Sequence, residues 1–224
     1  MKYQNIKQGT FISRPNRFIA YVEIDGKDEV CHVKNTGRCK ELLVPGCTVF
    51  VEESLNPARK TKFDLISVFK GDRLVNMDSQ APNKVFGEWV HNYFKNITLL
   101  KPESKYKNSR FDFYIEADGR KIFVEVKGVT LEKDNVVLFP DAPTERGVKH
   151  IKELCDCVKN GFEAYIFFVV QMTDVKYFTP NKETHKEFAD ALKKAQKKGV
   201  NVCCVDCFVS KNELKVKDNV GVVL

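Results

Sequence analysis

The sequence predicts a small β-barrel followed by a mixed α/β domain in which helices flank a sheet. Residues 9–75 contain five short runs rich in β-forming residues, separated by turn sequences such as Asp25-Gly26 and Pro45-Gly46. From residue 81 onward, segments with helical periodicity alternate with apolar runs that are typical of buried strands. We therefore expect a barrel domain over residues 1–80 and an α/β domain over residues 81–224.

The composition is that of a globular protein. Of the 224 residues, 30% are charged and 43% are hydrophobic. The net charge of +7 is spread over both halves, which favours a polyanionic partner only weakly. The N-terminal segment has no apolar core of signal-peptide length, and no later run reaches the length of a membrane span. We expect a cytoplasmic protein that does not interact with membranes.

Eight cysteines are expected to be reduced thiols in that compartment. Cys204 and Cys207 form a single CxxC pair inside an apolar run, without a second pair at zinc-finger spacing. Cys31, Cys39 and Cys47 recur every eight residues, with one histidine near them. A structural zinc site is one interpretation, and buried cysteines that pack as small hydrophobic residues are the favoured one.

The first domain is predicted to contain strands near residues 11–12, 17–24, 28–33, 48–52 and 64–69. Five short strands in about 70 residues suggest a five-stranded OB-type barrel, a fold that often binds nucleic acid. Arg14, Arg17 and Arg38 lie beside its turns and are candidates for phosphate contacts. The alternative is ordinary turn chemistry with solvated arginines.

A helix is predicted over residues 84–95, where apolar residues recur at a spacing of 3.6 and Asn83 is a plausible N-cap. Glu88 lies at the edge of the apolar stripe. It is either a solvated glutamate or, if this helix packs against the following hairpin, a third acid of a site there.

Residues 109–131 are predicted to form a β-hairpin around Asp118-Gly119, a dipeptide preferred in tight two-residue turns. In this register Ala117 faces Arg120, and the pairing continues outward to Asp112 opposite Glu125 and Arg110 opposite Lys127. One face should be apolar because side chains alternate, and it would carry Phe111, Phe113, Ile115, Ile122, Val124 and Val126.

The other face of the hairpin places Asp112 against Glu125, with Lys127 beside them. Like charges that face each other across two strands destabilise a sheet. A divalent cation such as Mg²⁺ or Mn²⁺ would remove the conflict, because hard cations bind carboxylate oxygens. The sequence therefore predicts a metal site at Asp112 and Glu125, and the alternative is a solvated polar face with an accidental pair of acids.

A strand near residues 136–139 precedes a predicted helix that has Thr144 as its N-cap and extends to about residue 159. Arg146, Lys149 and His150 lie in its first turns, where the helix dipole and the cations together could hold a phosphate. The alternative is an ordinary exposed helix face. A buried strand over residues 164–171, a helix over 183–198 and a strand over 200–209 complete a mixed sheet.

The order of these features resembles the core of PD-(D/E)xK nucleases. That core has a helix with a glutamate, then an acid on one strand and E-x-K on the next strand. The proline that commonly precedes the first acid is absent, since Arg110-Phe111 stands there. Longer strings closely resemble the sugar fermentation stimulation protein family across essentially the whole chain: residues 14–18 (RPNRF), 35–38 (NTGR), 109–113 (SRFDF), 125–131 (EVKGVTL), 139–142 (FPDA) and 146–150 (RGVKH). Gly128 stands where many members of that family have serine.

The resemblance implies an N-terminal OB-like domain, a C-terminal PD-(D/E)xK domain and a DNA-binding protein with a proposed regulatory link to sugar catabolism. One hypothesis is a nuclease in which Asp112 and Glu125 bind Mg²⁺ or Mn²⁺, Lys127 assists the attacking water and Glu88 is a third acid. A second is a non-catalytic DNA-binding regulator that keeps the nuclease core as a scaffold. An RNA-binding module would leave the acids unexplained. DNA strandedness and the formation of homo-oligomers stay open.

Overall fold

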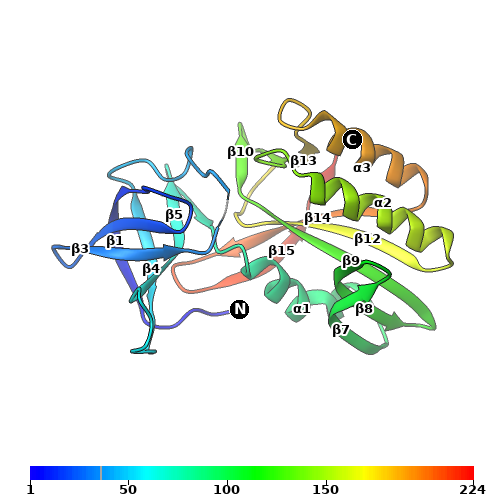
Figure 1. The fold of residues 1–224 in the computed structure, drawn as a ribbon, viewed down its shortest axis with the longest axis horizontal. Helices are drawn as coiled ribbons and strands as arrows, with labels where there is room; N and C mark the ends of the chain where they lie inside the picture. The colour runs from blue at the N-terminus through cyan, green and yellow to red at the C-terminus, as the bar shows by residue number, and fades with distance from the viewer. Residues whose placement is uncertain (36) are drawn as a thin grey trace.

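The structure, a computed structural model, describes residues 1–35 and 37–224 and contains a β-barrel beside an α/β unit (Figure 1). Thr36, which belongs to the string 35–38, lies outside the described residues. The barrel is built from the first six strands: β1 (Ile6–Ser13), β2 (Ile19–Ile24), β3 (Lys27–Val33), β4 (Thr48–Glu53), β5 (Phe63–Lys70) and β6 (Arg73–Asn76).

Five of these strands close on themselves. β1 pairs with β2 and β4, β2 pairs with β3, and β5 joins β3 to β4, so that the ring is complete. Alternate residues of β2, namely Ala20, Val22 and Ile24, fill the interior. The predicted OB-like five-stranded barrel is confirmed, and β6 is an additional strand at the edge of β5 that the sequence pattern did not predict.

The second unit is a mixed sheet with helices on both faces. Its elements are α1 (Ala81–Tyr93), β7 (Ile97–Tyr106), β8 (Ser109–Ala117), β9 (Arg120–Val129), β10 (Leu131–Lys133), β11 (Val136–Phe139), α2 (Glu145–Lys159), β12 (Glu163–Val170), β13 (Tyr177–Pro180), α3 (Lys186–Lys197), β14 (Asn201–Val209), β15 (Leu214–Asn219) and β16 (Gly221–Val222). The main sheet has the order β15-β14-β12-β9-β8-β7, in which β14, β12 and β9 are parallel. A smaller sheet has the order β10-β11-β13-β16.

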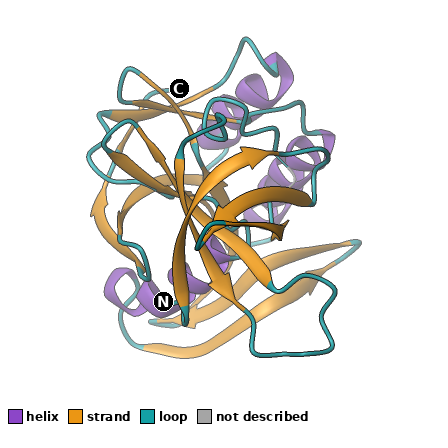
Figure 2. Ribbon diagram, turned by 90° about the vertical axis from the view of Figure 1, so that its left-hand side faces the viewer, coloured by secondary structure: helices purple, strands orange, loops and turns teal. Residues whose placement is uncertain are grey.

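α1 covers one face of the main sheet, while α2 and α3 cover the other (Figure 1). Phe86 of α1 packs against Phe113 and Phe167, with ring centroids 5.1 and 4.9 Å apart. The view turned by 90° shows the helices on opposite sides of the strands (Figure 2). The residues on the α2 side form one continuous cluster with the barrel interior, so the two units share a core.

The hairpin of β8 and β9 turns where the sequence predicts it. Asp118 and Gly119 have φ values of 51° and 73°, as a two-residue turn with left-handed residues requires. The predicted register is confirmed from Ala117 opposite Arg120 to Phe113 opposite Val124.

Beyond Phe113 the hairpin departs from the prediction. The recorded pairing ends there, so Asp112 does not pair with Glu125, and Arg110 does not pair with Lys127. The backbone N–H of Val126 donates instead to Oδ2 of Asp112 at 2.7 Å. The assignment of Phe111 to the face of Phe113 was wrong, because its ring packs 5.5 Å from Phe123 on the α2 side.

Two helices differ from the prediction in detail. α1 begins two residues before Asn83, whose side chain therefore lies within the first turn and does not cap the helix. The Thr144 cap of α2 is confirmed, since Thr144 Oγ1 accepts a hydrogen bond from the Gly147 N–H at 3.0 Å. The buried face of α2 includes His150 and Cys157.

A buried polar network joins the barrel to the main sheet. Nε2 of Gln171 donates to Oδ1 of Asn76 and to the Asp78 carbonyl at 2.8 and 2.9 Å. Nδ2 of Asn76 in turn donates to the hydroxyl of Tyr3 at 3.0 Å. Because these groups are removed from water, each hydrogen bond fixes the relative position of the two units.

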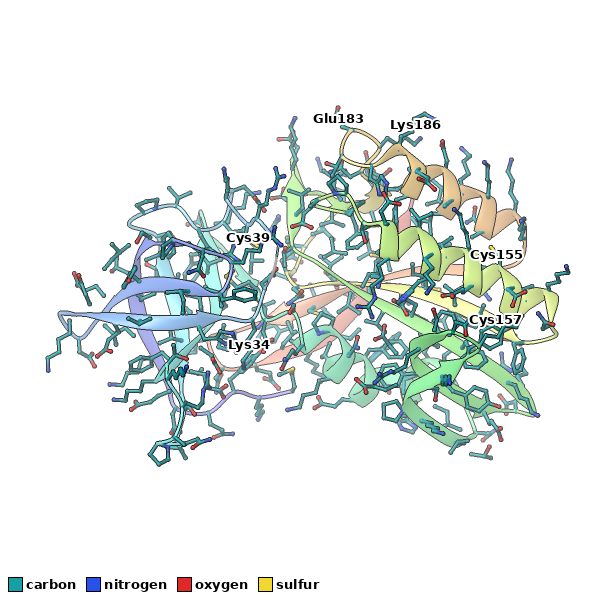
Figure 3. The ribbon with its side chains drawn as sticks, in the orientation of Figure 1. Lys34, Cys39, Cys155, Cys157, Glu183 and Lys186 are labelled. Carbon is teal, nitrogen blue, oxygen red and sulfur yellow. The ribbon has the colours of Figure 1, made fainter. Side chains whose placement is uncertain are left out.

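The cysteines of the described residues are all free thiols. Cys204 and Cys207 are buried in β14 beside apolar neighbours, in agreement with the favoured packing interpretation. Cys39 lies at the edge of the barrel and Cys155 lies on α2, well separated (Figure 3).

Among the described residues, no helix combines the length and the apolar composition needed to cross a membrane.

Candidate functional site

A cleft of about 430 Å³ opens where the start of α1, β8, β9 and α2 meet. Five of the residues predicted to form a metal or phosphate site line it together: Asp112, Glu125, Lys127, Arg146 and His150. They come from three different elements, so the fold assembles the group.

Asp112 is held by two donors. Nδ2 of Asn83 donates to Oδ1 of Asp112 at 2.6 Å, and the Val126 N–H holds Oδ2. Burial and the nearby negative charge of Glu125 together raise the pKa of Asp112 above its ordinary value, despite these hydrogen bonds. The two acids therefore lie close enough for the charge of Glu125 to act on Asp112.

Glu125 is almost fully buried, with 2% of its surface exposed. Oε1 accepts hydrogen bonds from Nζ of Lys127 and from Nδ1 of His150, both at 2.5 Å. Burial acts to raise the pKa of Glu125, but the hydrogen bond from His150 and the charge of Lys127 outweigh burial and lower it. Glu125 is therefore held as a carboxylate.

The second oxygen of Glu125, Oε2, is buried, and no donor among the described residues reaches it. A buried carboxylate oxygen without a partner is costly, and it is satisfied by a hydrogen-bond donor or by a cation. Oε2 lies in the same cleft as the coupled carboxylate of Asp112. These carboxylate oxygens therefore fit a hard divalent cation, which prefers oxygen ligands.

His150 is a positioning residue for Glu125. Its Nε2 lies 3.5 Å from Nε of Arg146, an atom that can only donate. We therefore assign the proton of a neutral His150 to Nδ1, where it donates to Glu125. The phosphate contact of His150 stays a prediction; only 5% of the residue is exposed, and its Nδ1 contacts Glu125.

The remaining predicted site residues of the α/β domain are not all in the cleft. The carboxylate of Glu88 lies 2.6 Å from the N-terminal amino group of Met1 and does not join Asp112 and Glu125. Lys149 is exposed and 3.9 Å from Glu153, one turn along α2. Arg146 lines the cleft with an exposed side chain that is able to meet a phosphate.

All three barrel arginines line one groove, but Arg14 is also bound to the backbone around it. The guanidinium of Arg14 donates to four backbone carbonyls, those of Arg17, Asn35, Gly37 and Arg38, at 2.6–2.9 Å. It therefore fixes the loops. Arg17 and Arg38 line a groove of about 700 Å³, together with Lys40 and with Ala142 and Pro143 from the segment before α2.

Glu145, His185 and Glu187 form a second group of potential metal ligands near the starts of α2 and α3. The Thr144 N–H donates to Nδ1 of His185 at 3.2 Å, which leaves the ring proton on Nε2, facing Glu145. A metal would need an unprotonated Nε2, and Glu145 is 83% exposed. This group fits a cation less well than the cleft does.

Asn83 is a site residue that the sequence analysis missed, because asparagine before an apolar helical stripe is an ordinary capping pattern. The burial of His150 had a visible sign: Gly147, His150, Leu154 and Cys157 recur at spacings of three and four, the period of one helix face.

Two family models match the chain. The model described as "Sugar fermentation stimulation protein RE domain" matches residues 80–213, and "SfsA N-terminal OB domain" matches residues 12–77. Sugar fermentation stimulation protein homologs from Clostridium beijerinckii and Ruminiclostridium cellulolyticum are each 63% identical over 226 residues, covering 100% of both chains. A solved structure of Pyrococcus furiosus SfsA in complex with Ca²⁺ is 27% identical, with a TM-score of 0.91, and the match covers 100% of this chain and 98% of that one.

Proposed function

The chain belongs to the sugar fermentation stimulation protein family, and from the acidic cleft of this member we propose that it is a divalent-metal-dependent nuclease that cuts phosphodiester bonds in DNA. The observation that carries the proposal is the buried Oε2 of Glu125, which has no donor among the described residues and shares a cleft with Asp112 and Lys127. The Ca²⁺ in the structure of the Pyrococcus relative supports a cation site in the family.

In this proposal Asp112 and Glu125 hold the cation. Bound Mg²⁺ or Mn²⁺ would supply an acidified water and neutralise charge on the phosphate. Asn83 and the Val126 N–H orient Asp112, while His150 orients Glu125. Nζ of Lys127 projects from the same strand as Glu125, where it can donate to the attacking water or to a phosphate oxygen. Arg146 at the rim of the cleft is placed to contact a neighbouring phosphate.

DNA is proposed as the partner because basic side chains flank the acids. The groove lined by Arg17, Arg38 and Lys40 lies on the barrel, and its wall includes Ala142 and Pro143 directly before α2. A strand that follows this groove would reach the segment that leads into Arg146. Positive groups along such a path bind the phosphate backbone without reading its sequence.

The test is cleavage of plasmid DNA by the purified protein in Mn²⁺, alongside thermal unfolding with and without Mn²⁺. We expect Asp112→Asn and Glu125→Gln to lose more than about a hundredfold in rate, since metal assistance contributes several kcal/mol. Both variants should also lose the rise in Tm that Mn²⁺ produces in the unmodified protein.

Glu145→Gln is the matched control, because it removes a carboxylate from the second ligand group and leaves the cleft intact. It should retain cleavage and the Mn²⁺ response. Loss of the Mn²⁺ response in Glu145→Gln alone would place the metal at the second group and contradict the proposal.

The second candidate function is a DNA-binding regulator without catalysis. The groove of about 700 Å³ with Arg17 and Arg38 favours it, because that groove can bind phosphates without the acidic cleft. DNA binding that persists while no divalent metal produces cleavage would favour the regulator.

A further inference from the structure

A separate cavity of about 160 Å³ lies between the barrel and the α/β unit. Ser79, Gly128 and Phe139 line both this cavity and the acidic cleft, so the two hollows share a wall. Gly37 lines both the cavity and the basic groove. The cavity therefore lies between the surface proposed to hold DNA and the acids proposed to cut it.

The size of the cavity matches one planar ring system. An engineered cavity of about 150 Å³ holds a benzene molecule, so the volume here accommodates a single nucleobase and not a base pair. Leu131, Leu138 and Phe139 supply apolar surface to the lining. Apolar walls with a few polar groups are typical of sites that bind small planar ligands.

The polar groups of the cavity include acceptors with free capacity. Gln171 is 1% exposed, and its Nε2 is used by Asn76 and Asp78, but no donor among the described residues reaches its Oε1. Asp141 lines the cavity as well, and within the described part of the chain its carboxylate accepts no hydrogen bond. The buried Oε1 of Gln171 requires a donor from a ligand or from water, whereas the half-buried carboxylate of Asp141 is free to accept from either.

Glycines make room for both oxygens. A Cβ atom at Gly128 would lie 2.6 Å from Oε1 of Gln171, and a Cβ at Gly37 would lie 2.5 Å from Oδ2 of Asp141. A side chain at position 37 would require Asp141 to shift, and one at position 128 would require Gln171 or Pro82 to shift. The glycines therefore preserve this arrangement of acceptors around an open volume.

We propose that this cavity receives one unpaired nucleobase from DNA bound across the basic groove and the acidic cleft. The inference rests on the proposed DNA binding and names its substrate class: DNA with a base that is unpaired or flipped out of the stack. Flipped bases enter pockets of this kind, where polar groups read their edges. Asp141 and Oε1 of Gln171 accept from ring N–H and exocyclic amino groups.

The test uses duplex DNA with 2-aminopurine opposite an abasic site, compared with the same duplex in which 2-aminopurine is paired with thymine. Binding and fluorescence are measured in EDTA, so that no strand is cut. We expect the unpaired duplex to bind at least about tenfold more tightly, because its base leaves the stack more easily. Its fluorescence should change as the base enters the cavity.

Two variants locate the base. Asp141→Asn replaces an acceptor oxygen by an amide donor, and Thr130→Leu fills part of the cavity. Each should reduce the preference for unpaired DNA about tenfold. Asp141→Asn does so because it removes a hydrogen bond to a charged group, and Thr130→Leu does so because it reduces the space for the base. Asp218→Asn changes an exposed carboxylate away from the three hollows and should keep the preference.

Equal binding of the two duplexes, or a preference that survives both variants, overturns the inference. The inference is also overturned if free deoxynucleoside monophosphate displaces the labelled DNA at concentrations as low as unlabelled DNA requires, because the cavity would then bind free nucleotides. Mn²⁺-dependent cleavage of paired DNA without any preference leaves the nuclease proposal standing and removes this one. A preference for unpaired DNA without any cleavage supports the base-binding cavity and contradicts the nuclease proposal.

Discussion

Glu125 uses its two oxygens in different ways. Oε1 is held by Lys127 and His150, while Oε2 has no donor among the described residues. A carboxylate that is fixed through one oxygen presents the other in a constant direction. This preorganisation reduces the rearrangement that a ligand must impose on the site.

His150→Ala is expected to reduce Mn²⁺-dependent cleavage by at least about tenfold and to destabilise the fold by about 1–3 kcal/mol, because it removes a donor from a buried carboxylate. His150→Gln, which retains a donor, should recover part of both losses. Cleavage assays and urea unfolding measure the two effects. Lys149→Ala, on the exposed side of the same turn, should change cleavage by less than about twofold. Equal losses in the two alanine variants would contradict the role of His150.

Asp64 is a buried carboxylate of the barrel, 3% exposed, with Arg59 at 2.5 Å and Lys34 at 3.0 Å. Burial acts to raise its pKa, but the hydrogen bonds from Arg59 and Lys34 outweigh burial and lower the pKa to about 2 from the ordinary 3.8. The folded state therefore favours the ionised form of Asp64.

Asp64→Asn should lower the free energy of unfolding by about 2 kcal/mol at pH 7, following the shift in pKa. Because the folded pKa is lowered, this stabilisation is complete above about pH 4 and is lost as the pH falls through 2. Urea unfolding of both proteins at pH 7, 4 and 2 measures the difference. A difference that stays constant down to pH 2 would contradict the assignment.

At the scale of elements, α2 brings Arg146 and His150 to the cleft. Its start is fixed by Oγ1 of Thr144, which accepts from the Gly147 N–H. Thr144→Ala should cost about 1 kcal/mol of stability, as the loss of an N-cap does, and should weaken cleavage because the first turn of α2 frays. Thermal unfolding and Mn²⁺-dependent cleavage measure both effects. Thr144→Ser keeps the hydroxyl and should behave like the unmodified protein, so a loss in the serine variant would argue against the cap.

Local chemistry explains which elements were predictable. The Asp118-Gly119 turn, the Thr144 cap and the apolar run of β12 each depend on neighbouring residues, and all three agree with the sequence prediction. β7 was missed because its sequence, ITLLKPESKY, mixes polar residues with Pro102. The strand tolerates proline because it lies at the edge of the sheet.

Contacts between distant segments explain what the sequence pattern could not predict. The small sheet pairs β13 with β11 and β16, which lie far apart along the chain. Glu88 meets the amino group of Met1, and Asn83 meets Asp112, through packing that no local pattern encodes. The acids and the lysine of the cleft were predictable because all three lie in one hairpin, whereas the cavity beside them requires both units.

At the scale of the whole molecule, the net charge of +7 is less informative than the position of the arginines. Arg17→Ala and Arg38→Ala should each weaken DNA binding. Each should also make the fall of the logarithm of the binding constant with the logarithm of the salt concentration less steep, by about 1 in slope. Fluorescence anisotropy at several salt concentrations measures this. Arg14→Ala should act chiefly on stability, because its guanidinium holds four carbonyls. Salt slopes that do not change in the Arg17 and Arg38 variants would exclude the groove as the DNA path.

The first residues of the chain are bound to the last strands. Lys2 forms a β-bridge with Glu213, and the Tyr3 N–H donates to the Asn212 carbonyl at 2.8 Å. During synthesis the barrel strands, complete by Asn76, emerge well before residues 212–214. At translation rates of about 5–20 residues per second the interval is roughly 7 to 27 seconds. We expect that the barrel of the nascent chain closes during this interval, while the surface that later packs against the α/β unit is still exposed. Chaperone binding to that surface would protect the nascent chain from aggregation.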